Sequence, residues 1–440
     1  MMVSGWGRFP EHLSQVTAPR TPEDIVQGLS AGGIVARGNG RAYGDSAVAL
    51  RRTLSMRNFN HILSFDPDSG VLEAEAGVLL GDIITAFLPR GWFPAVTPGT
   101  KFVTLGGMIA ADVHGKNHHK DGSFGNFINW IELLDAQGTL QRCGPDQNPA
   151  LFAWTVGGMG LTGVILRASI RLRPVQSAWI RQTTRPLPDL AATMAAFEKA
   201  DAATYSVAWI DCLSGGKNLG RSLVMLGEHA GPDALTDDKA RYPFETPVKR
   251  KLGVPFDPPQ GLLNSLSVRA FNALYYWNGS RKAGTSLVDW DSYFYPLDAI
   301  LGWNKIYGRK GFMQFQCVLP LEQSYEGLRA LLLATSRAGA GSFLAVLKRF
   351  GHQESAFSFP MLGYTLALDF PVTPRTLRLM KELDEIALAH GGRFYLAKDS
   401  RMDADTLRRS DVRTEGFAQM RSAQGLRPRF ASQQSERLGI

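Results

Sequence analysis

The spacing of apolar residues predicts a first block of strands and short helices that closes at Pro174. The clearest strand is 164–174 (VILRASIRLRP), where every second residue from Val164 to Leu172 is apolar. Short helices are marked by helical apolar spacing together with a capping residue or a final glycine. In chain order we expect a helix at 21–31, a strand running into the glycine-broken turn 32–47, a strand at 71–78, a helix at 79–91, two strands at 129–143 joined at Gln137-Gly138, and a short helix from Asn148-Pro149.

Beyond Pro174 the pattern changes to longer helices and strands. We expect helices at 188–200, 323–339 and 373–392, and strands at 204–212, 312–319, 343–350 and 364–370. A Pro- and Gly-rich section, roughly 230–290, is expected to be irregular, either a mobile lid or surface irregularity. Residues 393–401 predict a short strand and a polar turn, and a basic helical tail follows.

Composition describes a globular protein with an ample core. The chain has 440 residues, 44% of them hydrophobic, which favours two domains. The net charge of +8 includes one modest cluster, at Lys249, Arg250 and Lys251. The positive net charge favours an anionic ligand or an anionic membrane surface over nucleic acid, although basic residues scattered over the surface explain the charge equally well.

Cysteine usage and hydropathy bear on location. Cys143, Cys212 and Cys317 are isolated from one another, which disfavours a zinc or redox pair and fits a reducing compartment. The first residues lack the apolar core of a signal peptide, and no apolar run is long enough to cross a bilayer. The expected location is therefore cytoplasmic.

Two glycine-rich segments carry the candidate chemistry. They are 37–47 (RGNGRAYGDSA) and 98–126 (PGTKFVTLGGMIAADVHGKNHHKDGSFGN). Sharp turns at glycine leave main-chain N–H groups that can cradle phosphate oxygens. The pair predicts a wrap around a phosphate-bearing cofactor, with Gly99, Thr104, Gly106 and Gly107 as further donors and with His114 and Lys116 at its reactive end. The alternative is a glycine-rich surface loop.

Two other readings of this block are disfavoured. The GxGxxG at Gly158, Gly160 and Gly163 is preceded by an expected helix and followed by a strand, the reverse of a nicotinamide-binding Rossmann turn. A metal site at His114, His118 and His119 is disfavoured by the glycines around them. We expect His118 and His119 to be solvated bystanders.

Lys398, in the segment AKDSR, has two interpretations. A lysine beside an aspartate is usually a surface pair of small energetic consequence. If the C-terminal segment folds back against the cofactor, burial would lower the pKa of Lys398 and make it a candidate base.

A family resemblance joins these motifs. The two glycine segments, followed in order by TVGGMGLTGVI, FYPLD, GFMQFQCVLP, LKRFG, FSFPMLGYTLALDFP and YLAKDSR, resemble the decaprenylphosphoryl-β-D-ribose 2′-oxidase family of flavoenzymes, within the vanillyl-alcohol-oxidase superfamily. The resemblance implies an α+β fold with a two-part, PCMH-type FAD-binding domain (1–175 plus 393–440). It also implies an inserted α+β substrate domain (176–392) on an antiparallel sheet.

The resemblance further implies a reaction. The family oxidises the 2′-hydroxyl of a polyprenylphosphoryl-β-D-ribofuranose to a ketone with FAD, the first half of epimerisation to the arabinofuranose lipid. A separate NAD(P)H-dependent keto-reductase would complete the epimerisation, and the lipid carrier implies peripheral contact with the inner face of the membrane. The electron acceptor stays open. The alternatives are a soluble sugar-alcohol or aldonolactone oxidase that uses oxygen, and a binding module without turnover.

Site residues carry over by motif. Those implied to line the substrate side are Lys116, Gln314, Gln316, Lys348 and Thr365, with Lys398, His114 and Tyr43 handling protons. Those implied to contact FAD are Arg37, Gly38, Asn39, Gly40, Arg41, Ala42, Tyr43, Gly44, Asp45, Gly99, Thr104, Leu105, Gly106, Gly107, Ala111, Asp112, Val113, His114, Ile165 and Tyr395.

Three positions depart from related sequences. Arg41 stands where related sugar-alcohol oxidases have a histidine bonded to the flavin, so we expect FAD to be non-covalent. Ala367 and Thr365 stand where the mycobacterial enzyme has a cysteine and an asparagine. The missing thiol would abolish inhibition through that group, and the threonine leaves the exact sugar or lipid open.

Overall fold

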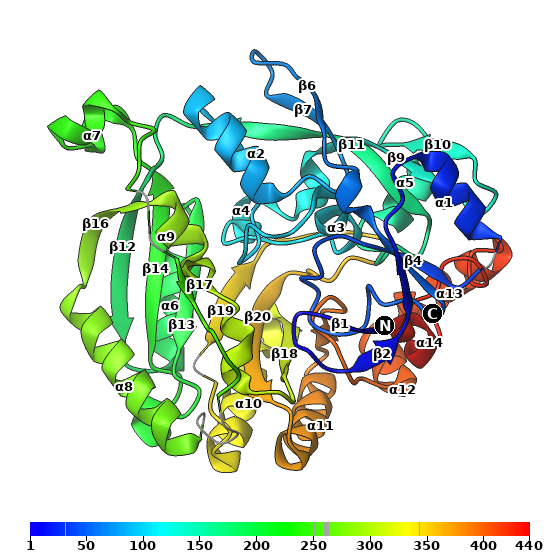
Figure 1. Ribbon diagram of the computed structural model, residues 1–440. Helices are drawn as coiled ribbons and strands as arrows, with labels where there is room; N and C mark the ends of the chain where they lie inside the picture. Colours follow the sequence, from blue (N-terminus) through cyan, green and yellow to red (C-terminus); the bar gives the residue numbers. More distant parts are fainter. Residues whose placement is uncertain (31, 248, 250, 259–263, 343) are drawn as a thin grey trace.

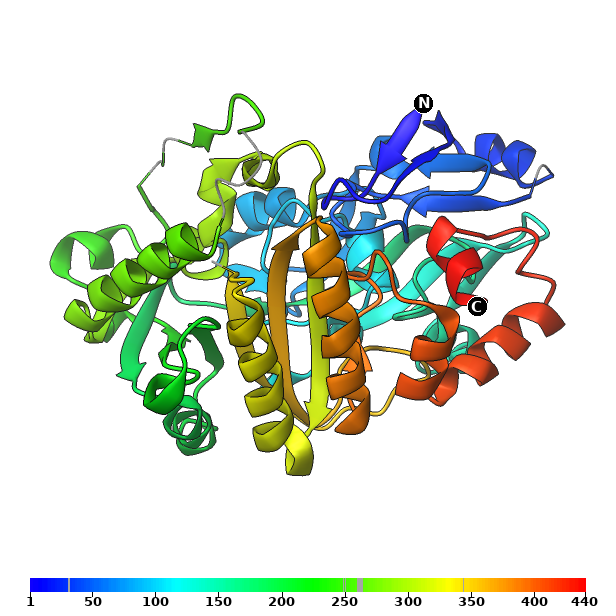
Figure 2. The same cartoon turned by 90° about the horizontal axis from the view of Figure 1, so that it is seen from below.

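The computed structural model describes residues 1–30, 32–247, 249, 251–258, 264–342 and 344–440. Mixed helices and strands are organised around two large antiparallel sheets (Figure 1). Both termini lie in the right half of the molecule in Figures 1 and 2.

The first sheet is built by the first block of the chain. Within the described residues its strands are β6 (Ile62–Phe65), β7 (Val71–Glu75), β8 (Trp92–Pro94), β9 (Ile128–Leu134), β10 (Leu140–Cys143) and β11 (Val164–Pro174). The predicted strand 164–174 is confirmed, and it is central because β7, β8 and β9 all pair with it. Smaller sheets pair β1 (Met2–Ser4) with β2 (Glu11–Leu13), and β5 (Arg52–Ser55) with both β3 (Gln15–Thr17) and β4 (Ile34–Arg37).

The first short helix of this block begins where its capping residue predicts. The expected helix at 21–31 is α1 (Pro22–Leu29), where Thr21 Oγ1 accepts a hydrogen bond from the N–H of Asp24 and the Asp24 carboxylate accepts one from the N–H of Thr21. The other helices are α2 (Leu80–Phe87), α3 (Leu105–Ala110), α4 (His118–Asp121) and α5 (Pro149–Thr155). Because α5 precedes the GxGxxG segment and β11 follows it, the order expected from the sequence is confirmed.

The second sheet has eight strands in the described part of the chain, in the order β16-β12-β14-β13-β19-β20-β18-β21, all antiparallel. They are β12 (Trp179–Leu187), β13 (Tyr205–Ile210), β14 (Ser222–His229), β16 (Gly284–Asp289), β18 (Phe312–Pro320), β19 (Ala345–Phe350), β20 (Gly363–Pro371) and β21 (Arg393–Phe394). Helices α10 (Ser324–Ala338) and α11 (Pro374–Ala389) lie side by side over one face of this sheet (Figure 2). Helix α6 (Leu190–Lys199) packs beside them.

The expectation of an irregular section at 230–290 is wrong for its second half. Helix α8 (Ser265–Arg281) and strand β16 occupy 265–289, while α7 (Asp237–Arg241) and β15 (Leu252–Gly253), which pairs with β17 (Ile300–Leu301), are short. Asn264 starts α8 with a capping box. The helix was missed because its apolar residues do not form one simple stripe. Arg250 of the basic cluster and residues 259–263 lie outside the described residues.

The C-terminal tail is helical, as expected, and folds back onto both sheets. It contains helices α12 (Ala404–Ser410), α13 (Arg413–Ala423) and α14 (Gln433–Leu438). Phe394, Leu407 and Phe417 belong to the same buried cluster as the strand residues of β18 and β20. Strand β21 pairs with β18, so residues 393–394 extend the second sheet. The division into domains at 175 and 393 stays a prediction.

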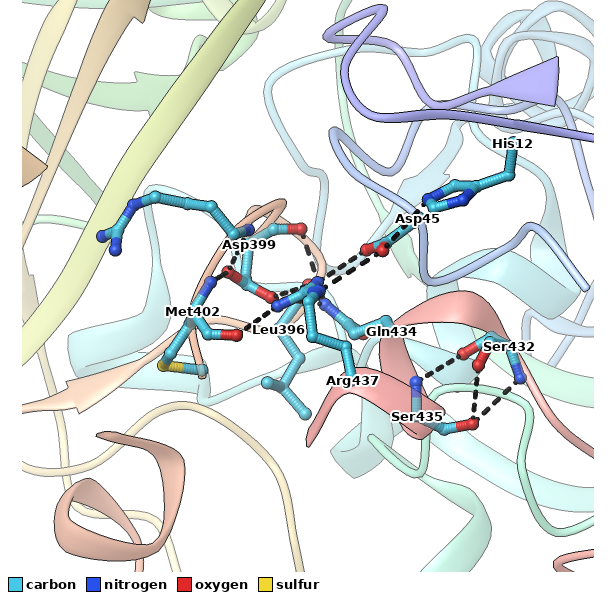
Figure 3. A network of polar contacts seen from close by, with 10 residues as sticks. His12, Asp45, Leu396, Asp399, Met402, Ser432, Gln434, Ser435 and Arg437 are labelled. Carbon is cyan, nitrogen blue, oxygen red and sulfur yellow. Dashed lines mark hydrogen bonds and ion pairs between the residues drawn. The ribbon is translucent and has the colours of Figure 1, made fainter. Parts of the chain in front are cut away.

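One buried ion network fixes the returning tail against the first glycine turn (Figure 3). Arg437 of α14 donates to Asp45 Oδ1 at 2.7 Å and to Asp399 Oδ2 at 3.0 Å. Gln434 donates to the main-chain oxygen of Leu396 at 2.8 Å and to Asp399 Oδ2 at 3.0 Å. Burial alone would raise the pKa of Asp399, but Arg437 and the N–H groups of residues 401 and 402 hold it below its ordinary value. Two segments far apart in the sequence are thereby held together.

Replacing Arg437 tests this network. Arg437→Ala leaves two buried carboxylates without their cation, so the free energy of unfolding should fall by about 3 kcal/mol, the lower end for a buried pair because 25% of the Arg437 side chain is exposed. A carboxylate with a lowered pKa stabilises the fold above its unfolded pKa, so the loss should be full at neutral pH and shrink as the pH falls through about 4.

Denaturant unfolding at neutral pH and at a pH below about 4 measures the loss in the free energy of unfolding. The matched control is Arg409→Ala, whose partner Glu385 is mostly exposed and which should cost less than about 1 kcal/mol. Equal losses for the two variants at neutral pH would contradict the network's role.

Candidate active site

One face of the second sheet carries polar side chains in an otherwise apolar core. In the register of β18, β20 and β19, Gln314 lies opposite Asp369, Gln316 opposite Ala367, and Lys348 opposite Thr365. Because successive residues of a strand point to opposite faces, these side chains share one face. The other face presents Phe315, Cys317, Leu366, Leu368 and Phe370 to the core under α10 and α11. We call the side chains of Gln314, Gln316, Lys348, Thr365 and Asp369 on this face the polar floor.

Lys398 lies over this floor because the tail folds back. The turn after β21 is anchored where the N–H of Tyr43 donates to the oxygen of Ala397 at 2.9 Å. The contact is so close that a Cβ on Gly44 would lie 2.1 Å from the oxygen of Asp399, so a residue with a side chain does not fit. Lys398 Nζ then lies 3.8 Å from the centre of the Tyr43 ring. The C-terminal segment thus folds back against the first glycine turn, where the cofactor is expected.

Burial changes the protonation of this lysine and of its neighbour Asp369. Desolvation lowers the pKa of Lys398 to about 7, a change opposed by Asp369 and reinforced by Lys348. Desolvation likewise raises the pKa of the Asp369 carboxyl, while a 2.5 Å hydrogen bond from Gln314 and the charge of Lys398 lower it. Asp369 Oδ2 has no hydrogen-bond partner in the described part of the protein. The two groups therefore titrate as a pair near neutral pH.

Asp369 is the site residue that the sequence analysis missed. It lies in the segment YTLALDF, where an acidic residue interrupts an apolar strand. A carboxylate in such a strand is seldom buried without a function or a partner. The acidic residue inside this apolar strand could therefore have identified Asp369 from the sequence.

Two further lysines belong to this group, since the charge of Lys348 acts on both Lys398 and Lys116. Desolvation lowers the pKa of Lys348 to about 8, and desolvation and the charge of Lys348 lower the pKa of Lys116 to about 7. Lys116 lies at the far side of the group, where its ammonium donates to the main-chain oxygen of Tyr293 and lies 4.0 Å from that ring. Three amines thus lie in one group, and the charge of a carboxylate, that of Asp369, acts on Lys398. Such a pocket favours an anion.

His114 is buried and neutral. Desolvation, followed by the charge of Lys348, lowers its pKa well below the ordinary value. The Gln316 amide donates to His114 Nε2 and to Thr365 Oγ1, both at 3.2 Å, and the Thr365 hydroxyl donates to the oxygen of Cys317. Since Nε2 accepts, the ring proton is on Nδ1, which has no partner among the described residues. His114 can therefore offer a hydrogen bond to a bound molecule.

The expectation that His118 is solvated is wrong. Only 1% of it is exposed, its Nε2 lies 2.6 Å from Gln353 Oε1, and its ring packs on Phe350. Gln353 also donates to Asp112, so His118 links the end of α3 to the segment after β19. His119 is half-buried with Nε2 2.8 Å from the oxygen of Ala203. No cluster of three or more metal-ligating side chains occurs in the described residues.

The first glycine turn is suited to hold a diphosphate. In the structure as described, the main-chain N–H groups of residues 38–42 donate to no protein acceptor. Main-chain N–H groups are normally paired, so these groups are free to bind the oxygens of a diphosphate. A Cβ on Gly38 would lie 2.1 Å from Thr104 Oγ1, so the two glycine segments meet here. Arg37 donates to the oxygen of Ser4, and Arg41 stacks on Trp6 at 4.3 Å.

The second glycine segment contributes shape more than donors. The N–H of Leu105 donates to Val78, that of Gly106 to Ala76, and that of Gly107 to Thr104 Oγ1. The N–H of Gly106 thus anchors α3 to the segment after β7, and that of Gly107 caps α3 at Thr104. The contact of Gly106 and Gly107 with FAD stays a prediction. Gly99 differs from them, since a Cβ there would meet no atom within 4 Å.

The remaining predicted cofactor residues lie around the two glycine segments. Tyr395 donates to the oxygen of Ala111 at 2.9 Å, which joins the returning tail to the end of α3. The carboxylates of Asp45 and Asp112 are held by protein donors, including Arg437 and Ser123. Val113 and Ile165 are buried in the core of the first sheet. Asn39 donates to the oxygen of Phe102.

The comparisons with known proteins agree with this geometry. Residues 14–144 match the family model described as FAD binding domain. The matched region contains both glycine segments, and the unpaired N–H groups of 38–42 fit a diphosphate. The chain is an FAD-dependent oxidoreductase with a PCMH-type FAD-binding domain.

A relative over the full length identifies the family. The chain is 36% identical, over all of its residues and 97% of the relative, to decaprenylphosphoryl-beta-D-ribose oxidase of Mycolicibacterium smegmatis. It is 34% identical, over 80% of this chain and 97% of the relative, to a Streptomyces coelicolor protein named only for its position in the mprA 5′ region. Cytokinin dehydrogenase 5 of Arabidopsis thaliana is 26% identical over 40% of this chain and 35% of its own. The chain belongs to the decaprenylphosphoryl-beta-D-ribose oxidase family.

Gly99 offers a test of the cradle that does not depend on turnover. Gly99→Ala adds a methyl group into open space, so the stability of the FAD-depleted protein should not change. If FAD occupies that space, its affinity should fall by about tenfold or more, the effect of overpacking a fitted contact. Flavin fluorescence titration and thermal unfolding of the depleted protein measure the two quantities.

The control is Gly253→Ala, whose Cβ also meets no atom within 4 Å but which lies on β15, away from the glycine turns. It should change neither quantity. Unchanged FAD affinity in Gly99→Ala would remove Gly99 from the cofactor site.

Proposed function

We propose that this protein oxidises the 2′-hydroxyl of a polyprenylphosphoryl-β-D-ribofuranose to a ketone, the first half of an epimerisation to the arabinofuranose lipid. The observation that carries the proposal is Lys398, a half-buried residue whose Nζ lies 3.8 Å from the centre of the Tyr43 ring and whose pKa desolvation lowers to about 7. It stands beside further amines, on the polar floor of a chain whose full-length relative is named for such a lipid-linked ribose.

Lys398 is the proposed proton acceptor. Oxidation of a secondary alcohol removes a hydride from carbon and a proton from the hydroxyl group. FAD, when bound, supplies the acceptor for the hydride. The hydroxyl proton passes to the neutral amine of Lys398, which is available at neutral pH because burial has lowered its pKa. Tyr43 and the Nδ1 proton of His114 orient the alcohol oxygen.

The other amines are proposed to bind the phosphate and the ring. Desolvation lowers the pKa of Lys348 to about 8 and that of Lys116 to about 7, and a phosphate beside them would stabilise their charged forms. Gln314, Gln316 and Thr365 offer amide and hydroxyl groups to sugar oxygens from the same face of the sheet. An anionic sugar fits this arrangement better than the neutral polyol of a soluble sugar-alcohol oxidase.

The remaining parts of the proposal concern the cofactor and partners. Arg41 is not a nucleophile, so FAD would be held without a covalent bond at that position. The keto sugar would pass to a separate NAD(P)H-dependent keto-reductase. A substrate on a lipid carrier also requires the protein to approach a membrane surface, at the inner face.

Anaerobic reduction of the flavin tests the substrate. A prenylphosphoryl-β-D-ribose should bleach the visible flavin absorbance of the FAD-loaded protein, and free polyols or aldonolactones should not. Bleaching by polyols alone would contradict the lipid-sugar assignment and favour the soluble-sugar alternative.

Replacement of Lys398 tests the proton acceptor in the same assay. Lys398→Ala should retain the flavin spectrum and lose flavin reduction by about a hundredfold or more, the usual contribution of a general base. Lys217→Ala, at an exposed lysine, is the control and should behave as wild type. Normal reduction in Lys398→Ala would assign the proton to another group.

A further inference from the structure

Helix α8 has an inner face that is fixed to the second sheet. Val268 and Asn272 are buried, and Asn272 donates to Asp211 Oδ1 at 2.8 Å. Tyr276 donates to the oxygen of Leu187, and a Cβ on Gly279 would lie 2.2 Å from the Leu223 side chain. These positions, spaced by three or four residues, form one stripe. The helix therefore cannot rotate to bury its other face.

The opposite face of α8 is apolar yet exposed. Positions 266, 270, 274, 277 and 281 follow helical spacing on the side away from the sheet. Leu266 is 76% exposed, Leu274 62% and Trp277 54%. We call the residues Leu266, Ala270, Leu274, Trp277 and Arg281 the outer face of α8. In Figure 1 the helix runs along the outer edge of the molecule. Contiguous exposed apolar side chains of this kind mark an interaction surface.

The charged residues of the segment that carries the outer face have one sign. From Pro258 to Val288 the sequence has no Asp or Glu, while Arg269, Arg281 and Lys282 are exposed. No ion pair involves these three residues in the described structure, and Arg281 instead lies over the Trp277 ring at 4.8 Å. Apolar and aromatic side chains beside unpaired cations are the composition of a helix that lies in a lipid headgroup region.

We propose that the outer face of α8 docks on an anionic lipid bilayer. The proposal extends the proposed function, which requires access to a lipid-linked sugar. No helix in the described chain is long and apolar enough to span a membrane. The leucines and Trp277 enter the headgroup boundary, and the three basic residues contact lipid phosphates. A second copy of the chain would be a worse match, because it would place these cations against each other.

Vesicle flotation with the FAD-loaded full-length protein tests the docking. Vesicles of phosphatidylcholine with roughly one third phosphatidylglycerol should carry the protein, and phosphatidylcholine alone should not. A variant with Leu266→Gln, Leu274→Gln and Trp277→Gln should bind the anionic vesicles roughly tenfold or more weakly. A variant with Arg269→Gln, Arg281→Gln and Lys282→Gln should lose the preference for anionic lipid.

The control is Leu140→Gln, which replaces a leucine of similar exposure on β10 and should bind as wild type. An unchanged flavin spectrum in each variant shows that it is folded. Failure of the wild type to bind either vesicle, or wild-type binding by the apolar variant, would overturn the proposal. So would a wild-type dimer in sedimentation that the apolar variant lacks, which would assign the face to a second copy.

Detergent-solubilised substrate separates this proposal from the proposed function. Both α8 variants should reduce their flavin with it at the wild-type rate, because they lie outside the pocket. Reduction without vesicle binding would overturn the docking alone, and vesicle binding without reduction by the wild type would overturn the proposed function alone.

Discussion

The burial of one ammonium group, Lys398, is the constraint on which the site depends. A lysine in an apolar setting is costly unless it loses its proton or gains a partner. Here it has Asp369 as a partner, and its pKa is lowered to about 7. The position is maintained by Arg437, which binds Asp45 and Asp399 together (Figure 3). An ion network remote from the pocket thus holds the group that we propose to handle the proton.

The two large sheets contribute to the site in different ways. The first sheet anchors α3 through Leu105 and Gly106, so the second glycine segment is rigid where a cofactor would lie against it. The second sheet presents amides, a hydroxyl and Lys348 on one face, while its other face is covered by α10 and α11. Because strand register fixes these side chains, the polar floor needs no loop to position it. Only the returning tail completes the site.

Much of the fold and most of the site residues follow from local patterns and motifs. Strand β11 alternates strictly, and α1 carries its own capping box, so both could be predicted from nearby residues. Helix α8 could not, because its outer face is apolar although exposed. Asp369 and the burial of His118 were missed because each depends on a partner distant in the sequence, Lys398 for the first and Gln353 for the second.

The pH dependence of anaerobic flavin reduction, in wild type and in Asp369→Asn, tests the central claim most directly. If the neutral amine of Lys398 accepts the proton, the rate rises with pH through the pKa of that lysine. The Asp369 carboxylate favours the charged ammonium, so its removal lowers the pKa of Lys398 and shifts the rising limb to lower pH. Asp405→Asn, at an exposed carboxylate, should leave the profile unchanged. A limb that stays in place or moves to higher pH in Asp369→Asn would contradict the account.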